Sequence, residues 1–257
     1  MDLSYDGGPF CGWQIQPSVP TVQGEIESVL ETLLHIHVGL VGAGRTDTGV
    51  HAQHYVAHFD YVGELDCAQL RYKLNAMLPK EIAISGISPA GNAFHARFDA
   101  VSRSYSYYLH RAKDPFLEGR SYYYAYPGVD FELMNKCASS LLGTHDFRCF
   151  EKSGGDNKTS VCTVTHAAWV QYGPGRWRFD ITADRFLRNM VRAVVGTLLE
   201  AGRGRRTPED FAALVLPVQD GDSSAGLAGR QVRRSEAGES VPAHGLYLTD
   251  VAYPAAG

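Results

Sequence analysis

The stretch Gly42-Ala43-Gly44-Arg45-Thr46-Asp47-Thr48-Gly49-Val50-His51-Ala52 holds the most specific chemistry in this chain of 257 residues. It places Asp47 two residues after Arg45 in a loop with several glycines, and glycine lets a backbone approach a ligand closely. The neighbouring guanidinium favours the ionised carboxylate, which is the form that acts as a nucleophile. The stretch therefore predicts either a catalytic carboxylate or a glycine-rich turn with a surface ion pair.

Three other functions are disfavoured by the surrounding residues. A phosphate-binding P-loop needs Gly-Lys-Ser/Thr after its second glycine, whereas valine and histidine follow the last glycine here. An aspartic protease needs a second Asp-Thr/Ser-Gly to share a proton with Asp47, and the sequence contains none. A metal site on His51, His54 and His58 conflicts with the strand pattern of this run, which sends His51 to the opposite face.

The composition is that of an ordinary globular protein, with 44% hydrophobic and 20% charged residues. No apolar run approaches the roughly 18 residues of a membrane span, and the start lacks the plan of a signal peptide. The five cysteines are scattered without C-x-x-C spacing. This disfavours a disulfide scaffold or a cysteine-based zinc site and favours a reducing compartment. We therefore expect a soluble, cytoplasmic protein.

The formal net charge of −4 conceals an uneven distribution. Residues 1–70 contain one basic residue against nine acidic ones, whereas residues 176–206 contain eight arginines against three acidic residues. In a helix predicted over 186–201, Arg185, Arg188 and Arg192 fall at i, i+3 and i+7, on one face. The segment predicts either a phosphate-binding face or a solvated arginine face.

Hydrophobic periodicity and breaker residues predict two successive passes of strands and helices. Helices are predicted over 22–33 after a Thr21 cap, 67–77, 131–142 and 186–201; strands are predicted over 3–5, 50–59, 82–84, 102–109, 161–172, 176–182 and 245–251. This recurrence indicates an α+β protein of two similar halves, 1–92 and 93–257. The polar run 218–241 predicts a mobile loop.

Six further blocks accompany the Asp47 stretch in a fixed order along the chain. They are Tyr5–Gln16, Thr21–Glu27, Phe94–Ala100 with Arg103-x-Tyr105-x-Tyr107, Gly143–Phe147, Phe186–Arg192 and Pro242–Leu248. With the loop Gly-Arg-Thr-Asp-x-Gly-Val-His-Ala, these blocks closely resemble the TruA family of tRNA pseudouridine synthases along nearly the whole chain.

The resemblance implies the pseudouridine synthase fold, in which two ferredoxin-like halves form one mixed, mainly antiparallel sheet with a central RNA-binding cleft. It implies that uridine is isomerised to pseudouridine at positions 38, 39 and 40 of the tRNA anticodon stem-loop. It also implies a homodimer that needs neither cofactor nor metal. Asp47 takes the role of nucleophile, with Arg45 and Arg192 as pairing arginines in the catalytic pocket.

Four further residues are expected to bind the substrate. The resemblance places Tyr105 against the target base and makes Leu246 an apolar wall, while Arg185 and Arg188 are positioned for phosphates. For Tyr105, ordinary packing within a tyrosine-rich strand is the alternative, and for Leu246 it is a place in the core.

Three departures separate this chain from the family pattern. The first strand is several residues short, Cys162 stands where an arginine is usual, and 218–232 looks inserted. Two other hypotheses also remain: an RNA-binding module without chemistry, and a hydrolase built on Asp47-Thr48-Gly49 or on the histidines. The first would bind tRNA without turnover, and the second would be sensitive to pepstatin or to chelators.

Overall fold

The computed structural model describes residues 1–154, 158–218 and 233–254. Its contacts divide the chain into two compact units. Unit 1 comprises Met1–Arg103 with the C-terminal segment that begins at Leu246, and unit 2 comprises Ser104–Gly245. This division differs from the predicted one at 92/93, because the last strand pairs with a strand of the N-terminal segment.

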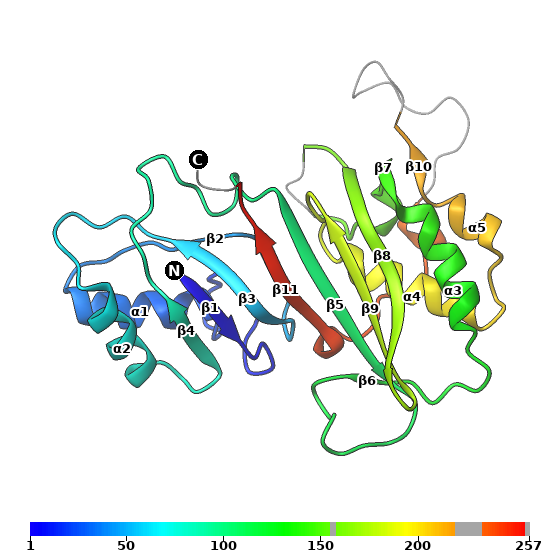
Figure 1. Cartoon of the computed structure of the whole chain (residues 1–257), viewed down its shortest axis with the longest axis horizontal. Helices are drawn as coiled ribbons and strands as arrows, with labels where there is room; N and C mark the ends of the chain where they lie inside the picture. The colour runs from blue at the N-terminus through cyan, green and yellow to red at the C-terminus, as the bar shows by residue number, and fades with distance from the viewer. Residues whose placement is uncertain (155–157, 219–232, 255–257) are drawn as a thin grey trace. The chain divides into compact units, whose positions relative to one another are not determined.

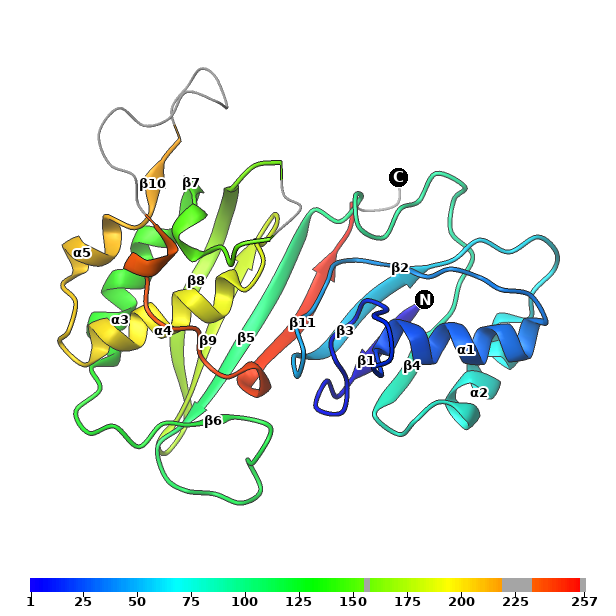
Figure 2. The ribbon, with the colours of Figure 1, turned by 180° about the vertical axis from the view of Figure 1, so that it is seen from behind.

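Unit 1 is a sheet covered by two helices. Its elements are β1 (Asp2–Tyr5), α1 (Val22–Leu34), β2 (Val41–Gly42), β3 (His51–His58), α2 (Cys67–Met77), β4 (Ile82–Gly86) and β11 (Leu246–Ala252). The strand order is β11-β3-β1-β4, and β2 pairs with β3. Among the described strand pairs of this unit, β11 and β3 run parallel and the other pairs are antiparallel. Both helices lie on the same face of this sheet (Figures 1 and 2).

The two helices of unit 1 begin at the residues that the local sequence predicts. The Thr21 side chain accepts a hydrogen bond from the Gly24 amide and caps α1. Val22, Ile26 and Leu30 recur at helical spacing and are fully buried. The helix predicted over 67–77 matches α2, which Asp66 caps. Capping and periodicity are local signals, so the sequence alone contains both.

Unit 2 contains the remaining elements. They are β5 (Ser102–His110, which starts in unit 1), β6 (Tyr122–Tyr123), α3 (Phe131–Ala138), η1 (Ser139–Leu141), β7 (Gly143–Asp146), η2 (Arg148–Phe150), β8 (Val161–Gly173), β9 (Arg176–Ala183), α4 (Met190–Gly202), α5 (Pro208–Ala212), β10 (Leu216–Pro217), η3 (Arg234–Glu236) and η4 (Ala243–Gly245). The strand order is β10-β7-β8-β9-β5, with β6 beside β5. The helices again lie on one face (Figure 2). Each unit therefore confirms the predicted α+β class with a mixed, mainly antiparallel sheet.

The helix α4 begins later than predicted, at Met190 rather than at residue 186. Asn189 has a φ of 63°, in the left-handed region, which a right-handed helix does not contain. The Met190 amide instead bonds to the carbonyl of Leu187 in a turn. Arg185 and Arg188 consequently lie outside the helix, and the predicted helical face of three arginines is wrong.

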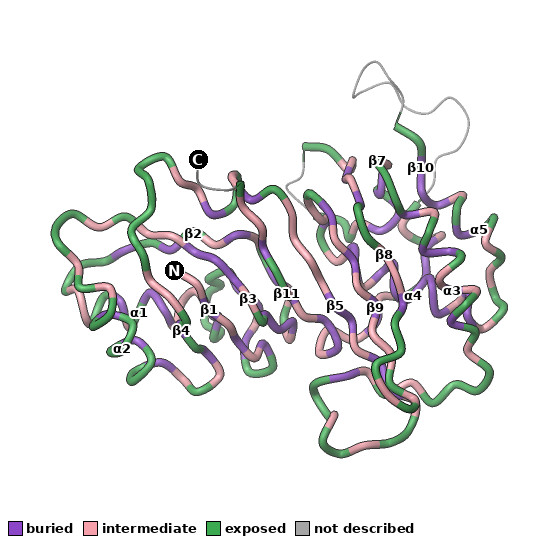
Figure 3. The backbone as a smooth tube through the Cα atoms, in the orientation of Figure 1, coloured by how far each residue is buried: buried purple, intermediate pink, exposed green. Residues whose placement is uncertain are grey.

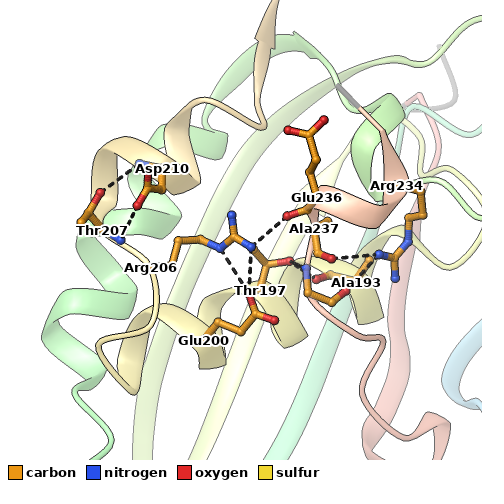
Figure 4. Close-up of polar contacts among 10 residues, drawn as sticks. Ala193, Thr197, Glu200, Arg206, Thr207, Asp210, Arg234, Glu236 and Ala237 are labelled. Carbon is orange, nitrogen blue, oxygen red and sulfur yellow. Dashed lines mark hydrogen bonds and ion pairs between the residues drawn. The ribbon is translucent and has the colours of Figure 1, made fainter. Parts of the chain in front are cut away.

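The prediction of a mobile loop over 218–241 concerns residues of two kinds. Residues 219–232 lie outside the described part of the chain. The following segment, Arg233–Val241, is tied to α4 in the structure (Figure 4). The Gly238 amide donates to Thr197 Oγ1 at 2.9 Å, in a buried position. Arg206 bonds both Glu200 Oε2 and the Glu236 carbonyl, each at 2.8 Å. Residues 233–241 are therefore a packed part of unit 2.

Many of the buried residues lie on the strands of the two sheets and on the helix α4 (Figure 3). Of the described helices, none has both the length and the apolar character needed to cross a membrane.

Candidate active site

The Asp47 loop, residues Ala43–Val50, connects β2 to β3. At the start of the loop the Ala43 amide donates to the Val56 carbonyl at 2.9 Å. At its end the Val50 amide donates to the Asp47 carbonyl at 3.1 Å. The middle of the loop is fastened by the Trp13 amide, which donates to the Thr46 carbonyl at 3.3 Å. Both ends and the centre of the loop are thus fixed by backbone hydrogen bonds.

Three aromatic rings support the loop from within unit 1. Trp13 stacks on Tyr55 with 4.1 Å between ring centroids, and Tyr5 lies 5.6 Å from Tyr55. The two tyrosine hydroxyls bind the loop. Tyr5 shares a buried 2.8 Å hydrogen bond with Thr46 Oγ1, and Tyr55 donates to the Gly44 carbonyl. These hydroxyls are satisfied by the loop while their rings are buried, as amphipathic aromatic side chains require.

Glycines make this close packing sterically feasible. Gly12 has a φ of +88°, and a Cβ there would lie 2.4 Å from the Thr46 carbonyl oxygen. A Cβ on Gly42 would lie 2.1 Å from the Tyr55 hydroxyl. At Gly44, by contrast, a Cβ would meet nothing within 4 Å. Gly12 and Gly42 are therefore needed for the position of the loop, whereas Gly44 leaves open space beside it.

The fixed loop leaves its charged residues accessible to different degrees. Thr46 is buried, Asp47 is half-buried, and Arg45 is exposed. Since the residue before Asp47 is anchored through its side chain and its carbonyl, the Asp47 backbone is held in place. A positioned carboxylate that keeps access to solvent is suited to attack on a bound substrate.

Leu246 lies at the same edge of the unit 1 sheet as the end of the Asp47 loop. It is the first residue of β11, whose Tyr247 pairs with His51 in parallel register. Parallel strands begin at the same edge, and β3 begins directly after the loop. Leu246 is 6% exposed, so most of its side chain already contributes to the core.

Arg192 is the one predicted site arginine that α4 carries. Its Nε donates to the Val241 carbonyl at 2.8 Å, and its own carbonyl accepts the Val241 amide at 3.2 Å. The next residue, Pro242, accepts a 2.9 Å hydrogen bond from the Tyr107 hydroxyl. Burial raises the pKa of Tyr107 well above its ordinary value, a neighbouring tyrosine adds to this, and Arg192 opposes it. Arg192 thus depends on the segment Arg233–Val241 for its orientation.

The other predicted residues of unit 2 have different surroundings. Tyr105 on β5 is half-buried, and its ring meets Phe186 edge-on at 5.1 Å. Arg188 is exposed, and its Nη1 lies 3.4 Å and 3.3 Å from the carbonyls of Ser153 and Gly154. Arg185 is half-buried, and its backbone amide donates a hydrogen bond to the side chain of Asp184.

The predicted site residues fall into two groups. Unit 1 brings together Arg45, Asp47 and Leu246 around one edge of its sheet. Unit 2 carries the other four, namely Tyr105, Arg185, Arg188 and Arg192. The pairing of Asp47 with Arg192 therefore stays a prediction.

Sequence reasoning missed the residues that hold the site in place. Tyr5, Trp13 and Tyr55 support the Asp47 loop, and Val241 holds Arg192. The first two lie in the opening block, but only the contacts show what they support. Val241 lies 49 residues from its partner, and no local pattern connects the two.

Cys162, at the position where an arginine was expected, is part of the core of unit 2. It lies on β8 opposite His145 and is fully buried. Burial raises the pKa of its thiol to about 12, so the thiol is protonated at neutral pH. Over the described part of the chain, His, Cys, Asp and Glu form no group that could hold a metal ion.

The fold and site are compatible with an enzyme that acts on a phosphate-bearing substrate. An α+β chain that fixes an aspartate in a glycine-supported loop, with a separate arginine-rich segment, fits nucleophilic catalysis on a phosphate-bearing polymer. The family model described as tRNA pseudouridine synthase matches residues 3–99 and 137–254.

Relatives match over nearly the whole chain. A protein of Parabacteroides distasonis named tRNA pseudouridine synthase A is 48% identical over 254 residues, which cover 98% of this chain and 94% of the relative. A protein of the same name from Porphyromonas gingivalis is 46% identical, covering 98% of this chain and 95% of the relative. One from Chlorobaculum tepidum is 43% identical over 84% of this chain and 87% of the relative. The chain belongs to the tRNA pseudouridine synthase family and is an isomerase of uridine in tRNA.

Proposed function

We propose that this enzyme converts uridine to pseudouridine at positions 38, 39 and 40 of the tRNA anticodon stem-loop, with Asp47 as its nucleophile. The observation that carries the proposal is the support of the Asp47 loop. Two tyrosine hydroxyls, the Trp13 amide and two glycines without room for a side chain all converge on the residues just before one half-buried carboxylate.

The reaction breaks the bond between C1′ of the ribose and N1 of uracil and joins C1′ to C5. The Asp47 carboxylate adds to C1′ or to C6 of the uridine. The N1–C1′ bond breaks with its electron pair on the base, and the base turns. C5 then bonds to C1′, which displaces the carboxylate if it had added to C1′; a carboxylate added to C6 is eliminated afterwards. The C5 proton leaves, and N1 takes up a proton. A carboxylate suits this sequence because it is both a nucleophile and a fair leaving group. Arg45, two residues before Asp47 in the loop, pairs with the carboxylate.

The remaining residues of the proposal serve substrate binding. Tyr105 lies against the turned-out base, and Arg192 pairs with Asp47 in the catalytic pocket. Arg185 and Arg188 contact phosphates, and Leu246 forms an apolar wall. The edge-on packing of Tyr105 against Phe186 supports its part, because it fixes the tyrosine ring before substrate binds.

The proposed substrate fits the cost of the chemistry. A target base must leave its stack to reach Asp47, and this unstacking costs a few kcal/mol of free energy. The cost is smallest in a loop or at the end of a stem. We further propose that the enzyme acts in the cytoplasm as a homodimer that binds tRNA, without a cofactor or metal. The five cysteines, all free thiols in the structure, support a reducing compartment.

The test is tritium release from tRNA labelled at C5 of uridine, in the presence of EDTA. We expect release by the wild type and none by Asp47→Asn, while the tRNA affinity of the variant stays within about tenfold, or 1.4 kcal/mol. Asp60→Asn, at an exposed aspartate of the same unit, is the matched control and should release tritium normally.

Transcripts that keep uridine at only one of positions 38, 39 and 40 then locate the reaction. Release from none of the three would contradict the anticodon assignment. Binding without release by the wild type would favour an RNA-binding module. Sensitivity to pepstatin or to EDTA, with cleavage of a substrate, would favour a hydrolase.

A further inference from the structure

A rigid turn, His95–Asp99, lies between β4 and β5 in unit 1. Asp99 Oδ2 accepts the His95 amide at 2.7 Å, and the Asp99 amide returns to the His95 carbonyl at 3.0 Å. His95 Nδ1 lies 3.2 Å from both the Arg97 and the Phe98 amides and accepts from them. Hydrogen bonds within the turn thus fix both its backbone and the ring of His95.

This turn presents an aromatic ring to solvent. Phe98 is 74% exposed, although its ring stacks on His95 with centroids 4.2 Å apart and planes 28° from parallel. His95 therefore covers one face of the ring and Arg97 also lies over the ring, yet most of the Phe98 side chain stays exposed. The exposed Arg97 places its guanidinium carbon 5.7 Å from the centre of the same ring. We call His95, Arg97 and Phe98 the Phe98 platform.

Arg103 connects the Phe98 platform to the Asp47 loop. Its Nη2 donates to the Ala43 carbonyl at 3.0 Å and to the Arg97 carbonyl at 2.5 Å. Ala43 precedes Asp47 by four residues, so the two lie within about 14 Å at full extension. A single side chain therefore joins the platform to the start of the Asp47 loop.

Two more contacts hold the turn against the sheet of unit 1. The Tyr253 hydroxyl donates to the Ala96 carbonyl at 2.6 Å, and the Ala96 amide donates to His58 Nδ1 at 3.1 Å. The segment between β4 and β5 also passes the end of β11, where the Val101 amide bonds to the Ala252 carbonyl (Figures 1 and 2). The Phe98 platform is thus organised before any ligand binds.

We propose that the Phe98 platform binds an unpaired nucleobase of the RNA substrate by stacking it on Phe98, with Arg97 contacting the adjoining phosphate. The proposal rests on the proposed function, because it takes the ligand to be the RNA that Asp47 modifies. An exposed aromatic ring next to a cation is the arrangement that holds unpaired bases in RNA-binding proteins. A fixed platform also loses little entropy when the base binds.

The alternative is that Phe98 only stabilises its own turn. Stacked aromatic pairs contribute to stability as well, so the variants must separate folding from RNA binding. Phe98→Ala removes the stack, and Phe98→Trp restores an aromatic face. Phe116→Ala is the matched control, since Phe116 is 90% exposed in unit 2 and is outside the proposed site.

The experiment measures KM, kcat and tRNA affinity for the three variants, with melting temperatures recorded alongside. We expect Phe98→Ala to weaken tRNA binding by about 5- to 100-fold, the range for loss of one stacked base, while kcat changes less than about twofold. Phe98→Trp should restore affinity, and Phe116→Ala should leave it unchanged.

Abasic substrates identify the stacked base. Each of these anticodon stem-loops lacks one loop base. For the wild type, one of them should bind more weakly than the intact stem-loop. For Phe98→Ala, the same abasic stem-loop and the intact one should bind equally well. Unchanged affinity in Phe98→Ala would overturn the proposal. So would an affinity loss accompanied by a matching loss of stability that Phe98→Trp does not restore.

Failure of this proposal is distinguishable from failure of the proposed function. If the Phe98 platform has no role, tritium release still depends on Asp47 and KM does not respond to Phe98. If the anticodon assignment is wrong, release maps to another uridine, while the response of tRNA affinity to Phe98 persists.

Discussion

The Asp47 loop of unit 1 and the arginine segment 184–192 of unit 2 are held in place in different ways. The loop is supported by side chains and glycines whose identity determines the fit, such as Tyr5, Tyr55 and Gly12. In the arginine segment, the arginine side chains bond to backbone carbonyls of other segments, since Arg192 donates to Val241 and Arg188 lies beside Ser153. Both regions therefore use backbone carbonyls, which every residue has, but the loop also needs glycine where a Cβ would clash, and that requirement is visible in the sequence.

This difference explains why one prediction succeeded and another did not. The stretch around Asp47 was expected to be a glycine-held loop, and the structure contains that loop. The arginines were expected on one helical face, but the left-handed Asn189 separates Arg185 and Arg188 from α4. Periodicity describes a helix once it has begun and does not locate its first residue.

The largest effect should come from Gly12→Ala. Left-handed backbone strain at a residue other than glycine costs about 1–3 kcal/mol, and the new Cβ would lie 2.4 Å from the Thr46 carbonyl. We expect the free energy of unfolding to fall by about 2–4 kcal/mol in denaturant titrations. Gly44→Ala, where a Cβ meets nothing within 4 Å, should change it by less than about 0.5 kcal/mol. Equal losses would refute the distinction between these glycines.

A smaller effect is expected from Arg192→Ala. Loss of a charge-assisted hydrogen bond of about 1.5–3 kcal/mol corresponds to a fall in kcat/KM of roughly 10- to 150-fold. Arg188→Ala should lower it by less than about fivefold, because an exposed arginine loses only a solvated contact. Steady-state tritium release measures both. A normal rate in Arg192→Ala would remove this residue from the catalytic pocket, and equal losses would restore the three arginines as one surface.

The smallest expected effect is the pH dependence of stability that comes from the ion pair of Asp146 with Arg148 in unit 2. Burial alone would raise the pKa of Asp146, but hydrogen bonds from Arg148 and Ser160 outweigh it and hold the pKa below the ordinary 3.8. The folded state therefore binds fewer protons than the unfolded state near that pH. The resulting stability is present above pH 3.8 and is lost as the pH falls through the lower pKa of the folded state.

Asp146→Asn should remove this pH dependence and cost about 1 kcal/mol at neutral pH, since the partner Arg148 is half exposed. Unfolding measured from pH 2 to pH 7 tests this, with Glu64→Gln as an exposed control. The contacts described for the Asp47 loop use hydroxyls, backbone groups and the Arg103 guanidinium rather than carboxylates, so hydrogen exchange should show acid loosening β7 before that loop. The reverse order would contradict the comparison of the two regions.

The sequence by itself determined those features that local chemistry specifies. The caps Thr21 and Asp66 and the spacing of Val22, Ile26 and Leu30 place α1 and α2 where they were predicted. The glycines around Asp47 and the ordered blocks identify the family. Each of these signals lies within a few residues of the feature that it specifies.

Only the tertiary structure decided the contacts between distant segments. It joins β11 to β3 and assigns the last strand to unit 1, it ties Arg192 to Val241, and it links Arg97 to Ala43 through Arg103. It also moves the start of α4 past a left-handed Asn189. These outcomes depend on hydrogen-bond partners tens of residues away and on a backbone conformation set by packing. A pattern confined to neighbouring residues contains no information about either.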